Sequence, residues 1–184
     1  NLPANPKVGV LSGSTAGTVV RQTSNSGFSV DFSLSGTGTQ SGAVIDFDNF
    51  STAPVETQNL STFDQFVFSV SGISGGRVKL EMEDLNGLKA STILTGLSTI
   101  SQYYVLSKNL FSSIDLTKVR RISFSVDPTL TSLTTGTFSV VARTLLFSTA
   151  TATTLSGTPT PLILEGSSAS TYLTETNSAQ AKLN

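Results

Sequence analysis

The sequence predicts an all-β fold, a sandwich or a barrel, and three observations carry this prediction. The dominant hydrophobic repeat is two residues, which is the repeat of a strand with one buried face and one face in water. About ten short apolar runs follow one another at intervals of roughly 8–14 residues, and turn-forming residues separate them. Helix is suggested only by single turns near 109–111 and 115–119.

The expected strands fall into a clear set and a weaker set. The clear ones alternate between apolar and polar residues at 28–34, 65–71, 77–83, 121–127 and from 138 to near 147. Shorter runs at 7–11, 18–22, 43–47, 90–94 and 102–107 complete the list. Between the third clear run and 90–94 stands the pair Asn86-Gly87, which is typical of a tight hairpin turn.

Alternation also predicts the core. The apolar residues of each run share one face, and we expect that face to be buried between two sheets. The prediction covers Phe66, Phe68, Val78, Leu80, Ile122, Phe124, Phe138 and Val140.

Composition changes at both ends of the chain. Residues 7–147 are expected to form one sandwich domain. Residues 1–6 are rich in Pro and Asn and lack a start Met, so we interpret them as an N-terminal extension left by signal-peptide removal from a secreted or cell-surface, bacterial protein. Residues 148–184 read as a Ser/Thr-rich linker, one possible added strand at 161–165, and a polar tail.

Composition excludes several classes of function. The chain has no Cys and no His, which excludes disulfides, zinc fingers, haem ligation and Ser-His-Asp catalysis. Lys plus Arg is 11 and Asp plus Glu is 12, so the formal net charge is −1. The sequence has no cluster of basic residues, which argues against nucleic-acid binding. No apolar run approaches the roughly 18 residues of a membrane span.

Three stretches in fixed order resemble galactose-binding-like jelly-roll domains, which include the non-catalytic carbohydrate-binding modules of bacterial surface proteins and glycanases. They are LSTFD at 60–64, EDLNG at 83–87 and FSSIDLTKV at 111–119, each next to an expected strand. The resemblance extends over residues 28–147. It implies a two-sheet antiparallel jelly-roll β-sandwich that binds polysaccharide and has no enzymatic activity.

The polar face of the run at 77–83 offers a candidate glycan site. The candidate residues are Arg77, Lys79 and Glu81, joined by Tyr104, Arg121 and Arg143 if their strands enter the same sheet. Planar hydrogen-bonding groups beside an aromatic ring would suit the hydroxyls and the apolar ring face of a sugar. A solvated sheet surface held by cross-strand pairs is the alternative.

Acidic residues raise two further possibilities. Asp46 and Asp48, with Asp31 nearby, could hold a structural calcium ion, and no other cofactor is expected. Glu81, Glu83 and Asp84 could in principle supply the carboxylates of a glycoside hydrolase. Because Lys and Arg stand beside them on an exposed strand, we expect no raised pKa and no enzyme.

Two functions follow from these observations. The first is a non-catalytic extracellular structural subunit that assembles with copies of itself into a filament, sheath or surface layer; the absence of Trp and the presence of only three Tyr favour it. In this hypothesis the segment Pro161-Leu162-Ile163-Leu164-Glu165 adds as a strand to a sheet edge of a neighbouring copy. The alternative is a carbohydrate-binding module that attaches to polysaccharide.

Overall fold

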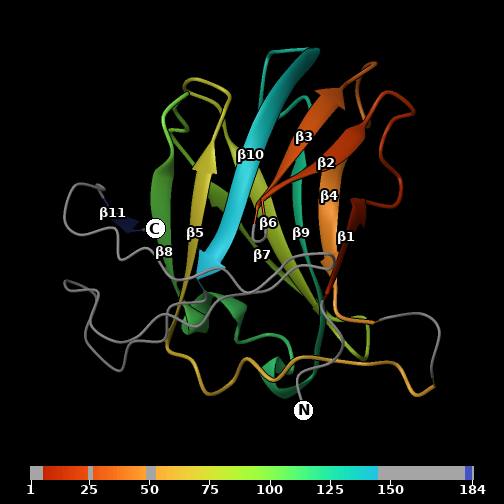
Figure 1. Ribbon diagram of the computed structural model, residues 1–184, viewed down its shortest axis with the longest axis vertical. Helices are drawn as coiled ribbons and strands as arrows, with labels where there is room; N and C mark the ends of the chain where they lie inside the picture. The colour runs from red at the N-terminus through yellow and green to blue at the C-terminus, as the bar shows by residue number, and fades with distance from the viewer. Residues whose placement is uncertain (1–5, 25–26, 49–52, 145–180, 184) are drawn as a thin grey trace.

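The computed structural model describes residues 6–24, 27–48, 53–144 and 181–183 (Figure 1). Within these ranges the strands are β1 (Lys7–Val10), β2 (Val19–Ser24), β3 (Gly27–Ser33), β4 (Ser41–Asp46), β5 (Gln65–Ser71), β6 (Val78–Asp84), β7 (Lys89–Leu94), β8 (Gln102–Ser107), β9 (Val119–Val126), β10 (Thr135–Thr144) and β11 (Ala181–Leu183). Two short 3₁₀ helices, η1 (Lys108–Phe111) and η2 (Leu116–Lys118), stand where the sequence predicts single helical turns.

The described strands form two sheets that pack face to face (Figure 1). One sheet has five strands in the order β1-β4-β9-β6-β7, and the other has six in the order β11-β8-β5-β10-β3-β2. Every pairing is antiparallel except that of β11 with β8. The chain passes between the sheets repeatedly, with β2–β3 and β6–β7 as local hairpins, so the fold is a two-sheet jelly-roll β-sandwich, as predicted.

The core lies between the two sheets and contains all eight side chains that alternation predicts, each at most 1% exposed. Phe124 is at its centre. Its ring meets Phe28 with ring centroids 5.9 Å apart and Phe68 at 5.3 Å, both edge to face. Edge-to-face packing adds to the stabilisation that burial of these rings supplies.

The β6–β7 hairpin forms around the predicted Asn86-Gly87 turn. Gly87 has a φ of 80°, a left-handed conformation that glycine adopts without strain. Asp84 is fully buried, and its Oδ1 accepts hydrogen bonds from the amides of Asn86 at 2.8 Å and Leu88 at 3.0 Å. Its Oδ2 accepts from the Asp115 amide at 2.9 Å, which attaches the turn to the loop before η2.

Two expectations about the strands were wrong, and others concern segments outside the described residues. β10 begins at Thr135 rather than at 138, because its pairing with β3 starts there. β5 does not have a wet face: it lies between β8 and β10, and Gln65, Val67 and Ser69 on its outer face are buried as well. The predicted assembly strand at 161–165, and the domain boundaries at 6 and 147, depend on segments outside the described residues.

At the C-terminal end the structure shows a strand that the sequence did not predict. β11 pairs with the edge strand β8 of the same chain, with Lys182 opposite Tyr104. Among the described residues, no helix has the length and apolar character needed to cross a membrane.

Candidate functional site

The outer face of the five-stranded sheet carries a row of alternating charges, which we call the charged face: Lys7, Asp46, Lys79, Glu81, Glu83, Lys89 and Arg121. The strand register creates the row. Lys7 stands opposite Asp46, and Asp46 stands opposite Arg121. Glu83 lies between Arg121 and Lys89 on its two neighbouring strands. Positive and negative groups therefore alternate across all five strands.

Ion pairs link these groups. The Arg121 Nε lies 3.7 Å from Asp46 Oδ2 and 3.7 Å from Glu83 Oε1. Glu81 holds two lysines, with Lys79 Nζ 2.6 Å from Oε2 and Lys89 Nζ 3.0 Å from Oε1. The side chains of Glu81 and Glu83 are only 17% and 13% exposed, so the lysine and arginine chains partly cover them. The carboxylates are thus fixed in position but still reachable.

The electrostatics of the face follow from burial and pairing. Burial raises the pKa of Asp46 because it disfavours the charged carboxylate. Burial acts in the same direction on Glu81, but hydrogen bonds from Lys79 and Lys89 outweigh it and lower the pKa of that carboxyl. In return the Glu81 carboxylate raises the pKa of the Lys89 amine. A lowered pKa does not suit Glu81 to the general-acid role of a glycoside hydrolase.

The centre of the charged face is lined by small side chains. Ser123 and Ser125 of β9 point outward and are buried below the longer chains around them. Gly42 of β4 stands opposite Ser125, and a Cβ there would lie 2.3 Å from the Phe124 carbonyl oxygen. Only glycine permits this close approach of β4 to β9. Small residues, two of them serines with a hydroxyl group, therefore lie between the charged groups.

The structure brings together some of the predicted glycan residues and separates others. Lys79, Glu81 and Arg121 do share the charged face, as predicted. Tyr104 does not: it belongs to β8 in the six-stranded sheet, is fully buried, and donates its hydroxyl to the Thr95 carbonyl oxygen at 3.0 Å. Arg143 lies in β10, also in the six-stranded sheet. The prediction of one shared face was wrong for these two residues.

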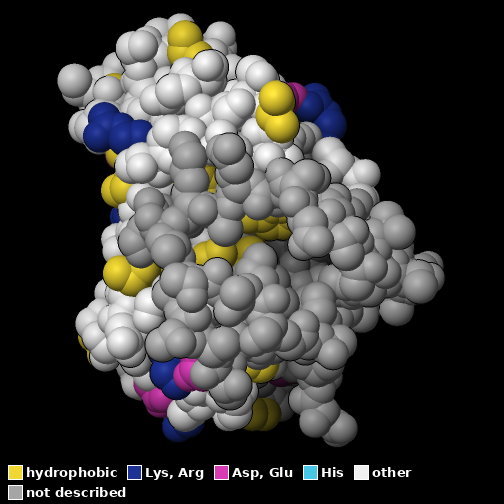
Figure 2. All heavy atoms as spheres, turned by 90° about the vertical axis from the view of Figure 1, so that its left-hand side faces the viewer, with side chains coloured by type: hydrophobic (Ala, Val, Ile, Leu, Met, Phe, Trp, Pro, Cys, Tyr) yellow, Lys and Arg dark blue, Asp and Glu magenta, His cyan; other side chains and the backbone are white. Residues whose placement is uncertain are grey.

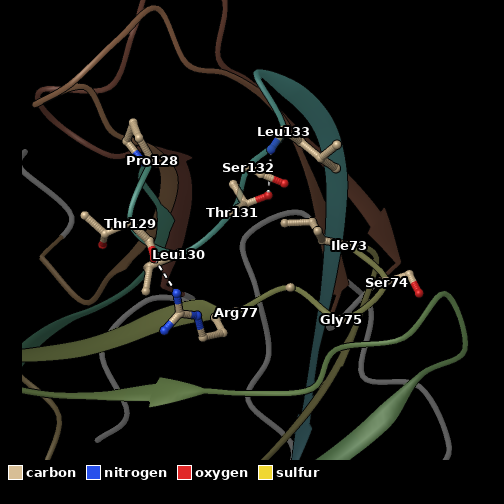
Figure 3. Close-up of a pocket in the computed structure, with 11 residues that line it drawn as sticks. Ile73, Ser74, Gly75, Arg77, Pro128, Thr129, Leu130, Thr131, Ser132 and Leu133 are labelled. Atoms are coloured by element: carbon tan, nitrogen blue, oxygen red, sulfur yellow. Dashed lines mark hydrogen bonds between the residues drawn. The ribbon is translucent and has the colours of Figure 1, made fainter.

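Arg77 has a different place, in a pocket of about 430 Å³ beyond the start of β6 (Figure 3). The loop between β5 and β6 forms one side of this pocket, and the loop between β9 and β10 forms the other. The Arg77 guanidinium donates a hydrogen bond to the Thr129 carbonyl oxygen across the pocket.

The two carboxylates predicted to hold calcium are neighbours at the end of β4. Asp46 Oδ1 accepts from the Asp48 amide at 3.0 Å, and Asp48 Oδ2 lies 3.6 Å from an Arg120 nitrogen. Asp31 is in β3 of the other sheet, where it pairs with Arg21. Among the described residues no group of three or more acidic side chains could hold a metal ion. Calcium binding by Asp46 and Asp48 stays a prediction.

Reasoning from the sequence placed Glu83 on the exposed strand but not among the candidate glycan residues, and it missed Lys7 and Lys89. A signal was present, since a hairpin about Asn86-Gly87 places residue 83 opposite residue 89. It also missed the loop at 127–134 that lines the pocket, and there the sequence offers no comparable signal.

Solved structures share this fold at low sequence identity. A family 30 carbohydrate-binding module gives a TM-score of 0.51 at 14% identity, over 84% of this chain and 90% of that chain. A family 11 module from Clostridium thermocellum, in complex with a β-1,3-1,4-mixed-linked tetrasaccharide, gives 0.50 at 14% identity, over 74% and 85%. The agarase AgWH50C gives 0.53 at 10% identity, over 74% of this chain but only 22% of the agarase.

These likenesses show the fold, a jelly roll of the kind found in carbohydrate-binding modules, which confirms the fold that the sequence resemblance implies. PfGH50B gives a TM-score of 0.54 at 13% identity, and the match covers 74% of this chain but only 21% of PfGH50B. No protein-family model and no curated protein matches the sequence.

Proposed function

We propose that the chain is a non-catalytic carbohydrate-binding domain of a secreted or cell-surface protein, and that it contacts polysaccharide through the charged face. The observation that carries this proposal is the row of ion-paired carboxylates, lysines and one arginine on the outer face of a jelly-roll sheet. Hydroxyl pairs of sugars are well matched by carboxylate and guanidinium groups that are already held in position.

The dimensions and charge of the face suggest the class of ligand. Strands lie about 4.8 Å apart, so a row across five strands spans roughly 19 Å, which suits an oligosaccharide better than a single sugar. Four cationic groups face three anionic ones, and nearly all are paired, which favours a neutral chain. Two of the similar structures are consistent with this choice. The family 11 module is in complex with a β-1,3-1,4-mixed-linked tetrasaccharide, and AgWH50C is an agarase.

Other partners have less support. On the side of the molecule shown in Figure 2, the Lys and Arg side chains of the described residues are scattered rather than gathered into one basic patch, which does not favour nucleic acid. Self-assembly into a filament, sheath or surface layer stays a prediction. No contact among the described residues points to it, and β11 of the same chain already occupies the edge of β8.

Affinity electrophoresis in gels containing mixed-linkage β-1,3-1,4-glucan, agarose or xylan tests the proposal. We expect at least one polysaccharide to retard the wild type, and Glu81→Gln or Arg121→Gln to weaken this retardation about tenfold, since each removes a charge-assisted hydrogen-bonding group.

Asp64→Asn is the matched control, because Asp64 is also an ion-paired carboxylate but pairs with Lys108, the first residue of η1, away from the charged face. Failure of the wild type to bind any glycan in a broad array would overturn the proposal. Equal losses in the control and in Glu81→Gln would remove the charged face from it.

A further inference from the structure

The pocket of Figure 3 is lined by loop residues and is not part of the charged face. Its volume of about 430 Å³ falls within the range of small-ligand sites. Its lining combines three apolar side chains with three hydroxyl residues: Ile73, Leu130 and Leu133, and Ser74, Thr131 and Ser132. Figure 3 shows Ile73 and Leu133 on one side and Arg77 directed toward the loop that carries Thr129 and Leu130.

The charge in this pocket is unbalanced. Arg77 is exposed, and among the described residues that line the pocket none is acidic. The nearest carboxylate in the sequence of the lining loop, Asp127, is engaged otherwise: its Oδ1 accepts from the Thr129 amide at 2.7 Å and from the Thr129 hydroxyl at 2.5 Å. Asp127 thereby shapes the loop that faces Arg77.

Arg77 is also held in place. Its guanidinium donates to the Thr129 carbonyl oxygen, which uses one nitrogen and leaves the rest of the planar fork for a ligand. Arginine forks match carboxylates through two parallel hydrogen bonds, a geometry that a point charge does not provide. Leu133, which is 47% exposed and lies across the pocket from Arg77, would cover the C–H face of a sugar ring.

We propose that this pocket binds a uronic acid residue, with the Arg77 guanidinium paired to the sugar carboxylate and the loop hydroxyls bonded to the ring hydroxyls. The site is separate from the charged face and does not depend on it for binding. A chain that carried both sites would recognise an acidic sugar at one place and a neutral stretch at another.

Isothermal titration with tetrasaccharides of galacturonate, mannuronate and hyaluronan tests this inference, with the methyl ester of the galacturonate tetrasaccharide as a neutral match and a sulfated carrageenan oligosaccharide as a second anion. We expect at least one uronate to bind and Arg77→Gln to weaken it about tenfold or more. The affinity of Arg77→Lys should lie between those of the wild type and Arg77→Gln, because lysine keeps the positive charge but lacks the planar fork of the guanidinium.

Three variants separate ligand binding from loop structure. Ser132→Glu leaves Arg77 in place but adds a competing carboxylate to the pocket, so it should abolish uronate binding. Ser132→Gln removes the same hydroxyl without adding a charge, so it should weaken uronate binding only slightly. Arg21→Gln removes an exposed arginine that pairs with Asp31 within the six-stranded sheet, far from the pocket in sequence, and it should bind uronate like the wild type.

The outcomes are decisive in each direction. Arg77-dependent binding of a uronate, with loss on methyl esterification and full retention in Glu81→Gln, supports the separate site even if no neutral polysaccharide binds. Binding of none of the three uronates, equal binding of the ester, or stronger binding of the sulfated oligosaccharide overturns the proposal. Loss of uronate binding in Glu81→Gln would show one site rather than two.

Discussion

The two faces of the five-stranded sheet are built from alternate residues of the same strands, yet they obey different rules. On the inner face, Leu80 and Phe124 are fully buried in a core that accepts any well-packed apolar set. On the outer face, the ion pairs of Glu81 and Arg121 depend on which residues the strand register places beside them. The inner face determines whether the chain folds, and the outer face is where we propose that the folded chain binds its ligand.

The largest effect should come from breaking the inner face. Phe124→Ala removes a ring that contacts Phe28 and Phe68 and leaves a cavity at the centre of the core. We expect the free energy of unfolding to fall by about 3–5 kcal/mol. Urea denaturation followed by circular dichroism measures it.

Ser123→Ala, one residue earlier in β9 and directed outward, is the matched control and should cost under about 1 kcal/mol. A similar loss in both variants would mean that the two faces of β9 do not differ as described.

A smaller effect is expected where a polar group enters the inner layer. Asp84→Ala leaves three backbone amides, those of Asn86, Leu88 and Asp115, without their acceptor. Loss of such an acceptor costs about 1–3 kcal/mol. Asp84→Asn should cost less, because its amide oxygen still accepts from the turn.

Hydrogen exchange at Asn86 and Leu88 localises the change: faster exchange at these two amides in Asp84→Ala is the expected result. Unchanged exchange there would mean that the buried carboxylate does not hold the turn.

Local pattern predicted most of the fold, because strands and hairpins depend on residues close in sequence. The alternation at 77–83 and the Asn86-Gly87 turn predicted one hairpin correctly, and the structure shows that its register places Glu83 opposite Lys89. Tyr104 shows where local pattern stops. The run at 102–107 has apolar residues in succession, so the sequence does not distinguish its inward positions from its outward ones. Tyr104 points inward, and its hydroxyl donates to a backbone carbonyl oxygen rather than to a ligand.

The candidate sites depend on contacts distant in sequence. Asp46 meets Arg121 only because β4 pairs with β9, and the pocket forms only because Lys79 pairs with Ser125, which brings the loops at 71–77 and 127–134 together. Single-sequence reasoning has no measure of such registers. It therefore identified Arg77, Lys79, Glu81 and Arg121 as candidates but assigned all four to one face, whereas Arg77 lines the pocket.

The smallest expected effects concern the pH dependence of the outer face, and they have opposite signs at two carboxylates. The folded-state pKa of Glu81 is lowered below its ordinary 4.5, so its stabilising contribution is present above that pH and is lost as the pH falls through the folded value. Glu81→Gln should therefore be less stable than the wild type at pH 7, by under about 1 kcal/mol, and match it near pH 3.

Asp46 should behave in the reverse way. Burial raises its folded-state pKa above the ordinary 3.8, so the folded state favours the protonated carboxyl, and this preference is present below pH 3.8 and lost as the pH rises through the folded value. Asp46→Asn, which stays neutral, should therefore gain stability relative to the wild type between pH 3 and pH 7, again by under about 1 kcal/mol. Urea midpoints at pH 3, 5 and 7 for both variants test the pair together. If both variants shift in the same direction with pH, then lysine pairing at Glu81 and burial at Asp46 are not the forces that distinguish these two carboxylates, and the charged face would be a uniform solvated surface.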